Sequence, residues 1–152
     1  AGKAVALKEC ATVEYQDYAK KVIENCQELA KGLEAAGMRA VSGGTQTHLA
    51  LIDIRSTKVN GKIADERCGR AGLSLNKNAI PYDPETPAVT SGIRVGTAAI
   101  TTQGMGKPEM NQIATFIARA IKDGEDDSKA KAIRAEVHQL TAKFPVYPEP
   151  KN

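Results

Sequence analysis

The stretch Ser91-Gly92-Ile93-Arg94-Val95-Gly96-Thr97 places one arginine between two β-branched aliphatic residues, with a glycine on either side. Such a short apolar run predicts a buried β-strand. A guanidinium group stays charged and presents a rigid fork of donors that fits a carboxylate, so Arg94 on this strand predicts an anion-binding site. The alternative is that Arg94 faces solvent or pairs with a neighbouring Asp or Glu, because most arginines stay exposed.

Helical periodicity dominates the chain before this strand. Residues 1–10 are predicted to be helical without an evident capping residue, and a break follows near residues 11–12. From residue 15 to residue 33, apolar residues recur at spacings of three and four, which predicts a long amphipathic helix. Gly37 stands where a left-handed residue would end that helix.

The middle of the chain combines short strands, turns and one helix. Residues 38–41 and 48–54 are predicted strands joined by a turn, and the second is apolar enough to be covered on both faces. Asn60-Gly61 predicts another turn, after which a short helix ends at Gly72 and a brief strand spans residues 73–75. A stiff, extended loop then leads to the arginine-bearing strand, because it contains three prolines: Pro81, Pro84 and Pro87.

Two helices and a tail complete the chain. Pro108 and Glu109 suit the first turn of a helix, and Ser128 is a candidate cap for the last one. The tail at residues 144–148 must dock its aromatic side chains or fray. The whole pattern predicts an α+β domain with a small, mostly antiparallel sheet of three or four strands covered by helices.

Composition argues against several classes of function. The 152 residues carry a net charge of +3 without any block of basic residues, so we expect no dedicated nucleic-acid surface. No apolar run is long enough to cross a membrane and no secretory signal opens the chain, so we expect no membrane partner. The three cysteines, Cys10, Cys26 and Cys68, suggest neither a disulfide framework nor a metal site, and this favours a cytoplasmic location. We expect all three in the core or at its boundary.

Two motifs that suggest catalysis or phosphate binding fail on inspection. Gly104-Met105-Gly106-Lys107 is similar to the end of a P-loop, but Thr101 replaces the first glycine and Pro108 replaces the Ser or Thr. His48 and His138 lack companions at ligand spacing, so we expect His48 to be a hydrogen-bonded structural residue. No serine or cysteine lies in a nucleophile elbow, and the chain therefore does not contain a complete active site of its own.

Four segments carry a resemblance to a known family: Val41-Ser42-Gly43-Gly44-Thr45, His48-Leu49 with Asp53, Asn76-Lys77-Asn78-Ala79-Ile80-Pro81-Tyr82-Asp83-Pro84, and Thr90 to Thr97. In their order and spacing they resemble the C-terminal part of serine hydroxymethyltransferase. The combination of the Asn-Lys-Asn-x-x-Pro-x-Asp-Pro loop with the Ser-Gly-Ile-Arg-Val-Gly-Thr strand is highly specific. The resemblance extends from the first residue to Phe144-Pro145.

This resemblance implies a fold type I enzyme that uses pyridoxal 5'-phosphate to interconvert serine plus tetrahydrofolate and glycine plus 5,10-methylenetetrahydrofolate. It also implies a large N-terminal domain that holds the cofactor and its Schiff-base lysine. That domain is not among these residues and no lysine matches the cofactor lysine, so we expect the chain alone to be inactive. The implied partners are the missing large domain, serine, glycine, folate and the further subunits of a homodimer or higher oligomer.

The resemblance assigns roles to two residues. Arg94 matches the arginine that binds the α-carboxylate of serine or glycine, in agreement with the guanidinium fork on a strand. Asn78 matches an asparagine that hydrogen-bonds the pteridine part of folate, whereas the alternative for Asn78 is an Asx bond that stabilises a turn. The chain departs from the family at Gln46, Thr47 and Gln103, and no function is carried onto them.

The resemblance also divides the chain. Residues 1–36 are expected to form hinge or interdomain helices, residues 37–123 an α/β small domain, and residues 124–152 a C-terminal helix and tail. Two other functions remain open. In a stand-alone regulatory module, Arg94 would bind an amino acid without a cofactor. In a structural interaction domain, Arg94 would form an internal salt bridge and the helix over residues 15–33 would pack on a partner.

Overall fold

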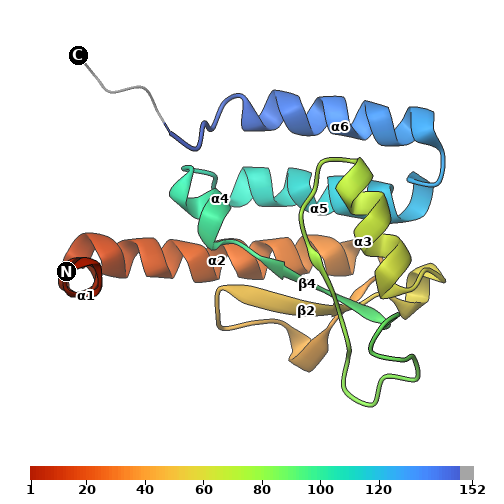
Figure 1. The fold of residues 1–152 in the computed structure, drawn as a ribbon, viewed down its shortest axis with the longest axis horizontal. Helices are drawn as coiled ribbons and strands as arrows, with labels where there is room; N and C mark the ends of the chain where they lie inside the picture. Colours follow the sequence, from red (N-terminus) through yellow and green to blue (C-terminus); the bar gives the residue numbers. More distant parts are fainter. Residues whose placement is uncertain (148–152) are drawn as a thin grey trace.

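A four-stranded antiparallel sheet forms the centre of the computed structural model, which describes residues 1–147 (Figure 1). Its strand order is β1-β2-β4-β3, and every neighbouring pair is antiparallel. The strands are β1 (Arg39–Ala40), β2 (Leu49–Asp53), β3 (Asn76–Asn78) and β4 (Gly92–Gly96). The predicted α+β fold with a small antiparallel sheet is confirmed.

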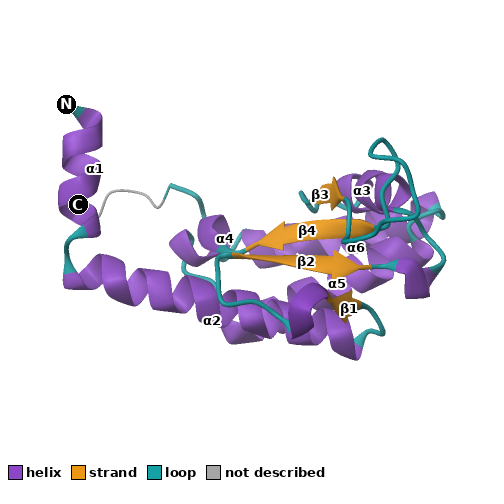
Figure 2. Cartoon of the chain, turned by 90° about the horizontal axis from the view of Figure 1, so that it is seen from below, coloured by secondary structure: helices purple, strands orange, loops and turns teal. Residues whose placement is uncertain are grey.

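Helices cover one face of this sheet and leave the other face open in this chain. Figure 2 views β2 and β4 from the open side, with α5 behind them. Two short 3-10 turns lie beside the sheet, η1 (Val41–Gly43) and η2 (Arg55–Thr57). The helices are α1 (Gly2–Cys10), α2 (Val13–Ala35), α3 (Gly61–Arg70), α4 (Ala98–Thr102), α5 (Lys107–Asp123) and α6 (Asp127–Thr141).

The long helix α2 has the ends and the apolar face that its sequence predicts. The Thr12 side chain accepts a hydrogen bond from the Tyr15 amide at 3.2 Å and caps the first turn. Gly37 adopts a φ of 91° and ends the helix in the left-handed region, which glycine enters without steric cost. The apolar face packs on α5 and the sheet, with these residues buried: Val22, Cys26, Leu29, Ala30 and Leu33.

One hydrophobic core lies between the helices and the inner face of the sheet. Alternate residues of β2 and β4 point into it, because successive side chains of a strand point to opposite faces. From the sheet these are Ala50, Ile52, Ile93 and Val95, and from α5 they include Met110, Ile117 and Ile121. Burial of this apolar surface is the main stabilising contribution to the fold.

Three local predictions are wrong. Asn60 does not form a turn but caps α3, since its side chain accepts from the Ile63 amide at 2.9 Å. The third strand is Asn76–Asn78 and not residues 73–75, whose leucines pack against the core from a loop. The cap of α6 is Asp126 and not Ser128, because a carboxylate is a stronger acceptor for the free amides of a first turn.

Burial also differs from expectation in three places. Strand β2 is not covered on both faces, because Leu49 and Leu51 are only half-buried on the open side. Cys10 is exposed on α1, whereas the other two cysteines are buried as predicted. In the tail, Phe144 packs against the core while Tyr147 is exposed, and Pro148 lies outside the described residues.

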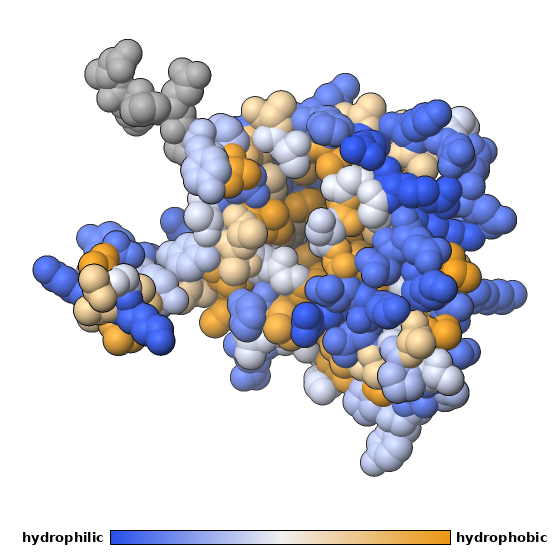
Figure 3. Space-filling view, viewed as in Figure 1, coloured by the Kyte–Doolittle hydropathy of each residue, from blue (hydrophilic) through white to orange (hydrophobic). Residues whose placement is uncertain are grey.

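The surface of the described part is mixed in character. Figure 3 shows apolar residues exposed on the projecting helix α1 and in a hollow over α5, and hydrophilic residues over the end near α3. Within residues 1–147, no helix is both long enough and apolar enough to cross a bilayer. Nor do the His, Cys, Asp and Glu side chains of this part of the chain form a group that could hold a metal ion.

Candidate functional site

The strand register brings the two sequence-predicted residues onto the open face of the sheet. Arg94 lies directly opposite Leu51 on β2 and Asn76 on β3. Asn78 lies opposite Gly92, two residues before Arg94 on the same strand. Residues directly opposite one another share a face of a sheet. Arg94 and Asn78 therefore lie on neighbouring strands, on the face without helices.

Arg94 is exposed and its guanidinium group has little to bind within the described chain. One Nη lies 3.5 Å from Asn76 Oδ1, and no acidic side chain of residues 1–147 forms a salt bridge with Arg94. On its own strand, the neighbours on the same face are Gly92 and Gly96, which have no side chain to cover it. The expectation of a buried apolar site around Arg94 is wrong for this chain, because Arg94 is exposed, as the alternative of a solvent-facing side chain expects. The other alternative, a salt bridge, is not formed within residues 1–147.

Asn78 is half-buried at the end of β3 and has one local hydrogen bond. Its Nδ2 donates to the carbonyl of Ala79 at 2.8 Å. That bond holds the amide through a contact within its own loop. It therefore resembles the turn-stabilising bond that was the alternative role for Asn78. No other residue of the described chain donates to Asn78 Oδ1, so the amide keeps an acceptor for a ligand.

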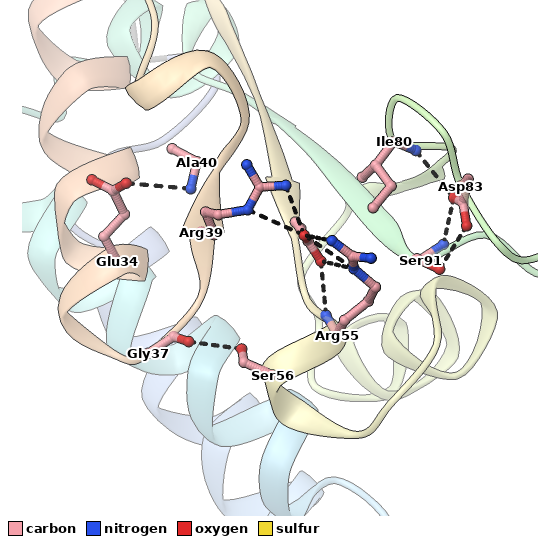
Figure 4. A network of polar contacts seen from close by, with 10 residues as sticks. Glu34, Gly37, Arg39, Ala40, Arg55, Ser56, Ile80, Asp83 and Ser91 are labelled. Atoms are coloured by element: carbon pink, nitrogen blue, oxygen red, sulfur yellow. Dashed lines mark hydrogen bonds and ion pairs between the residues drawn. The ribbon is translucent and has the colours of Figure 1, made fainter.

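The loop between β3 and β4 is organised by the carboxylate of Asp83 (Figure 4). One oxygen accepts from the amides of Ile80 at 3.1 Å and Ser91 at 2.9 Å. The other accepts from Ser91 Oγ at 2.6 Å and the Glu85 amide at 2.9 Å. Burial tends to raise the pKa of Asp83, but these donors outweigh it and lower the pKa to about 2.

A second carboxylate, Asp53, ends β2 and binds Arg39 and Arg55, the two arginines labelled in Figure 4. Its oxygens accept from Arg55 Nη2 at 2.8 Å and Arg39 Nη2 at 2.9 Å, although only 5% of Asp53 is exposed. The hydrogen bonds from the Arg55 side chain are the main reason why the pKa of Asp53 falls to about 2. One carboxylate thus pairs with two guanidinium groups, which ties the end of β2 to β1 and to the turn after β2.

Two residues near the end of β4 have structural contacts. Thr97 is fully buried, and its Oγ donates to the carbonyl of Val22 at 2.8 Å, which ties the strand end to α2. Its amide donates to the carbonyl of His48 at 3.0 Å. The imidazole of His48 is exposed and has no hydrogen bond within residues 1–147, so the expected role as a hydrogen-bonded structural histidine is wrong.

Sequence reasoning gave no role to Asp83 or to the Asp53 cluster. For Asp83 a signal was available, because an aspartate between prolines in a loop is typical of a side chain that accepts nearby backbone amides. For Asp53 the signal depends on the pairing of β1 with β2, which places Arg39 directly opposite. Such a pairing is not visible in the local sequence.

Comparison with known proteins identifies the family. The family model described as serine hydroxymethyltransferase matches residues 1–117. The chain belongs to the serine hydroxymethyltransferase family. Among its relatives, the serine hydroxymethyltransferase of Myxococcus xanthus (strain DK1622) is 46% identical over 147 residues. That match covers 97% of this chain but only 35% of the relative, so the chain spans about a third of that relative's length.

Proposed function

We propose that this chain is the C-terminal part of a serine hydroxymethyltransferase that interconverts serine plus tetrahydrofolate and glycine plus 5,10-methylenetetrahydrofolate. The chain would contribute one wall of the active site, and a large domain would contribute the rest. Support comes from the family match and from the share of the relative, 35%, that the chain spans. A wall of this kind needs polar groups on a surface that a second domain can cover, and the open sheet face offers both.

The role we propose for Arg94 is to bind the α-carboxylate of serine or glycine. The observation that supports it most is that Arg94 is exposed on the open face with no acidic partner among residues 1–147. Its fork of donors matches a carboxylate in two parallel hydrogen bonds. Binding the carboxylate at two points fixes the rotation of the amino acid and so selects which bond at Cα is presented for reaction.

The role we propose for Asn78 is to bind the pteridine part of folate. An amide offers both a donor and an acceptor, as a pteridine edge does. Asn78 is separated from Arg94 by one strand spacing and two residues along the sheet, so ligands bound to both would lie side by side. That neighbourhood suits transfer of a one-carbon unit between an amino acid and a folate.

Pyridoxal 5'-phosphate, when bound, supplies an electron sink for chemistry at Cα. The described residues on the open face do not offer the lysine that such a cofactor needs. Lys77 is the lysine on the four strands, but its Nζ donates to the carbonyl of Ala88 at 2.9 Å and it points to the opposite face from Arg94. We therefore place the cofactor in the large domain.

The remaining features follow from this proposal. Residues 1–36 would be hinge or interdomain helices, because α1 exposes apolar side chains that a neighbouring domain would cover: Val5 and Leu7. Residues 37–123 would form the small domain and residues 124–152 its C-terminal helix and tail. The whole enzyme would be a cytoplasmic homodimer or higher oligomer in one-carbon metabolism and glycine biosynthesis.

Reconstitution tests the proposal. The purified chain, alone and mixed with the large domain supplied as a separate polypeptide, is given pyridoxal 5'-phosphate, serine and tetrahydrofolate, and glycine formation is measured. We expect glycine only from the mixture, and a loss of that activity with Arg94→Ala. A mixture that associates and binds the cofactor but forms no glycine would contradict the proposal. Glycine or serine binding by the chain alone would instead favour a regulatory module.

A further inference from the structure

We propose that Asp83 is a positioning residue, which holds β3 against β4 so that Asn78 presents its amide beside Arg94. Asp83 would not itself contact a substrate. The inference rests on the proposed function, because it concerns how the folate contact is held in place. It is carried by the four hydrogen bonds that converge on one carboxylate in the loop at residues 79–91.

The position of Asn78 in the sheet makes such support necessary. Strand β3 is short and lies at the edge, so it pairs with β4 alone. The pair Asn78 and Gly92 is the last of that ladder before the chain leaves the sheet. An edge strand held by one short ladder frays at its end unless further contacts fix it. Asn78 lies at the end that would fray.

Asp83 connects the two chain segments just beyond the ladder, in addition to the bond from Lys77 Nζ to the Ala88 carbonyl. It binds the amides of Ile80, two residues after Asn78, and of Ser91, the residue before β4. One carboxylate thus bridges the departing and the returning chain where backbone pairing has stopped. The same end is also fixed to β2, because the Ser91 carbonyl accepts from the Ile54 amide at 3.1 Å. The buried side chain of Ile80 packs against Gly92.

Backbone strain in the same loop indicates that its conformation is imposed. Tyr82 has a φ of 56° and Thr90 a φ of 60°, both in the left-handed region. That region is unfavourable for a β-branched or aromatic residue, and it persists only where surrounding contacts enforce it. Each strained residue is next to a member of the Asp83 cluster, Asp83 itself or Ser91. The hydrogen bonds of Asp83 therefore oppose the relaxation of the loop.

The test replaces the carboxylate by an amide in the whole enzyme, with the large domain present. Asp83→Asn keeps one acceptor oxygen and replaces the other by an NH2 donor, so at least one backbone amide loses its acceptor: that of Glu85, or those of Ile80 and Ser91. We expect the KM for tetrahydrofolate to rise about tenfold or more, while the KM for serine stays within about twofold. Arg94 lies in mid-strand between two ladders and is less sensitive.

A matched control is available in Asp126. Its carboxylate accepts from the Ser128 amide at 2.8 Å and Ser128 Oγ at 2.6 Å, which is the same chemistry as Asp83 with Ser91. It caps α6, away from β3 and β4, so Asp126→Asn should lower stability without changing the KM for folate. If Asp83→Asn does not fold, Ser91→Ala removes a single bond of the cluster and should raise that KM about threefold.

The possible outcomes separate this inference from the proposed function. An unmodified enzyme that transfers no one-carbon unit to folate would overturn the proposed function and the inference with it. An active enzyme whose KM for folate is unchanged by both Asp83→Asn and Ser91→Ala would overturn the inference alone. The inference would also be overturned if Asp126→Asn raised the KM for tetrahydrofolate as much as Asp83→Asn does, since the effect would then be one of general stability.

Discussion

Replacing Gly92 by alanine should destabilise the sheet at the point where the site is built. A Cβ at position 92 would lie 2.9 Å from the Asn78 carbonyl oxygen on β3, 2.9 Å from the Ile52 carbonyl oxygen on β2 and 2.6 Å from Ile80 Cγ2. Because β4 lies between β2 and β3, a shift away from one oxygen is a shift toward the other. Overpacking of this kind costs about 3 kcal/mol at the upper end of the observed range.

Part of that cost is offset, because alanine loses less conformational entropy than glycine in a strand, by about 0.5–1 kcal/mol. The expected net loss in the free energy of unfolding for Gly92→Ala is therefore about 2 kcal/mol. Gly96→Ala is the matched control on the same strand and face. Its Cβ would meet nothing closer than the His48 carbonyl oxygen at 3.4 Å, so this variant should be neutral or slightly more stable.

Urea unfolding of the chain, followed by circular dichroism, measures both variants. With a slope of about 2 kcal/mol per molar urea, the Gly92→Ala midpoint should fall by about 1 M while the Gly96→Ala midpoint stays in place. Equal midpoints for the two variants, at unchanged slope, would refute the reasoning, because they would mean that the strands around Gly92 can separate without cost.

Two further predictions concern titratable groups. The pKa of Asp53 is about 2 in the folded chain, chiefly because of Arg55, and about 3.9 when unfolded, so its pairing adds about 2.5 kcal/mol above pH 5 that is lost as the pH falls toward 2. The free energy of unfolding of Asp53→Asn should therefore fall less between pH 5 and pH 2 than that of the unmodified chain. An equal fall in both proteins would refute the lowered pKa of Asp53. Burial raises the pKa of Cys68 to about 12 and that of Cys26 above its usual value, whereas Cys10 is exposed. A thiol reagent at pH 8 should therefore label Cys10 alone in the native chain, and rapid native labelling of Cys68 would contradict this burial.

Local sequence determined the elements that depend on local physics. The spacing of apolar residues over positions 15–33 predicted α2, because one face of a helix must meet the core every three or four residues. Gly37 marked its end because few residues other than glycine tolerate a φ of 91°. Pro108 and Glu109 similarly located the start of α5, where the Glu109 carboxylate accepts from the Gly106 amide at 2.8 Å.

Features that depend on pairing between distant segments could not be predicted in this way. Asn76–Asn78 has poor strand propensity, and it is a strand because β4 offers it a partner. The apolar Leu73 and Leu75 looked more like a strand, but they are used to fill the core. Asp126 and Ser128 are both residues that cap helices, and only the folded turn shows that the Asp126 carboxylate accepts the free amides of α6.

The candidate site shows the same division. Arg94 and Asn78 were found from motifs, but their location on one open face follows from the register of three strands. The apolar strand around Arg94 suggested burial, yet this chain alone leaves that face uncovered. Asp83 was part of a recognised motif, and its four donors became apparent only when both ends of the loop were placed in space.

The central claim is that Arg94 binds the carboxylate of the amino-acid substrate, and the KM for serine of two lysine variants in the whole enzyme tests it most directly. Arg94→Lys keeps the charge but loses the two-point fork, so we expect the KM for serine to rise about 10- to 100-fold. Arg39→Lys changes a half-exposed arginine of the same sheet that pairs with Asp53, and its KM should stay within about twofold of the unmodified enzyme. A KM for serine that Arg94→Lys leaves unchanged would contradict the account.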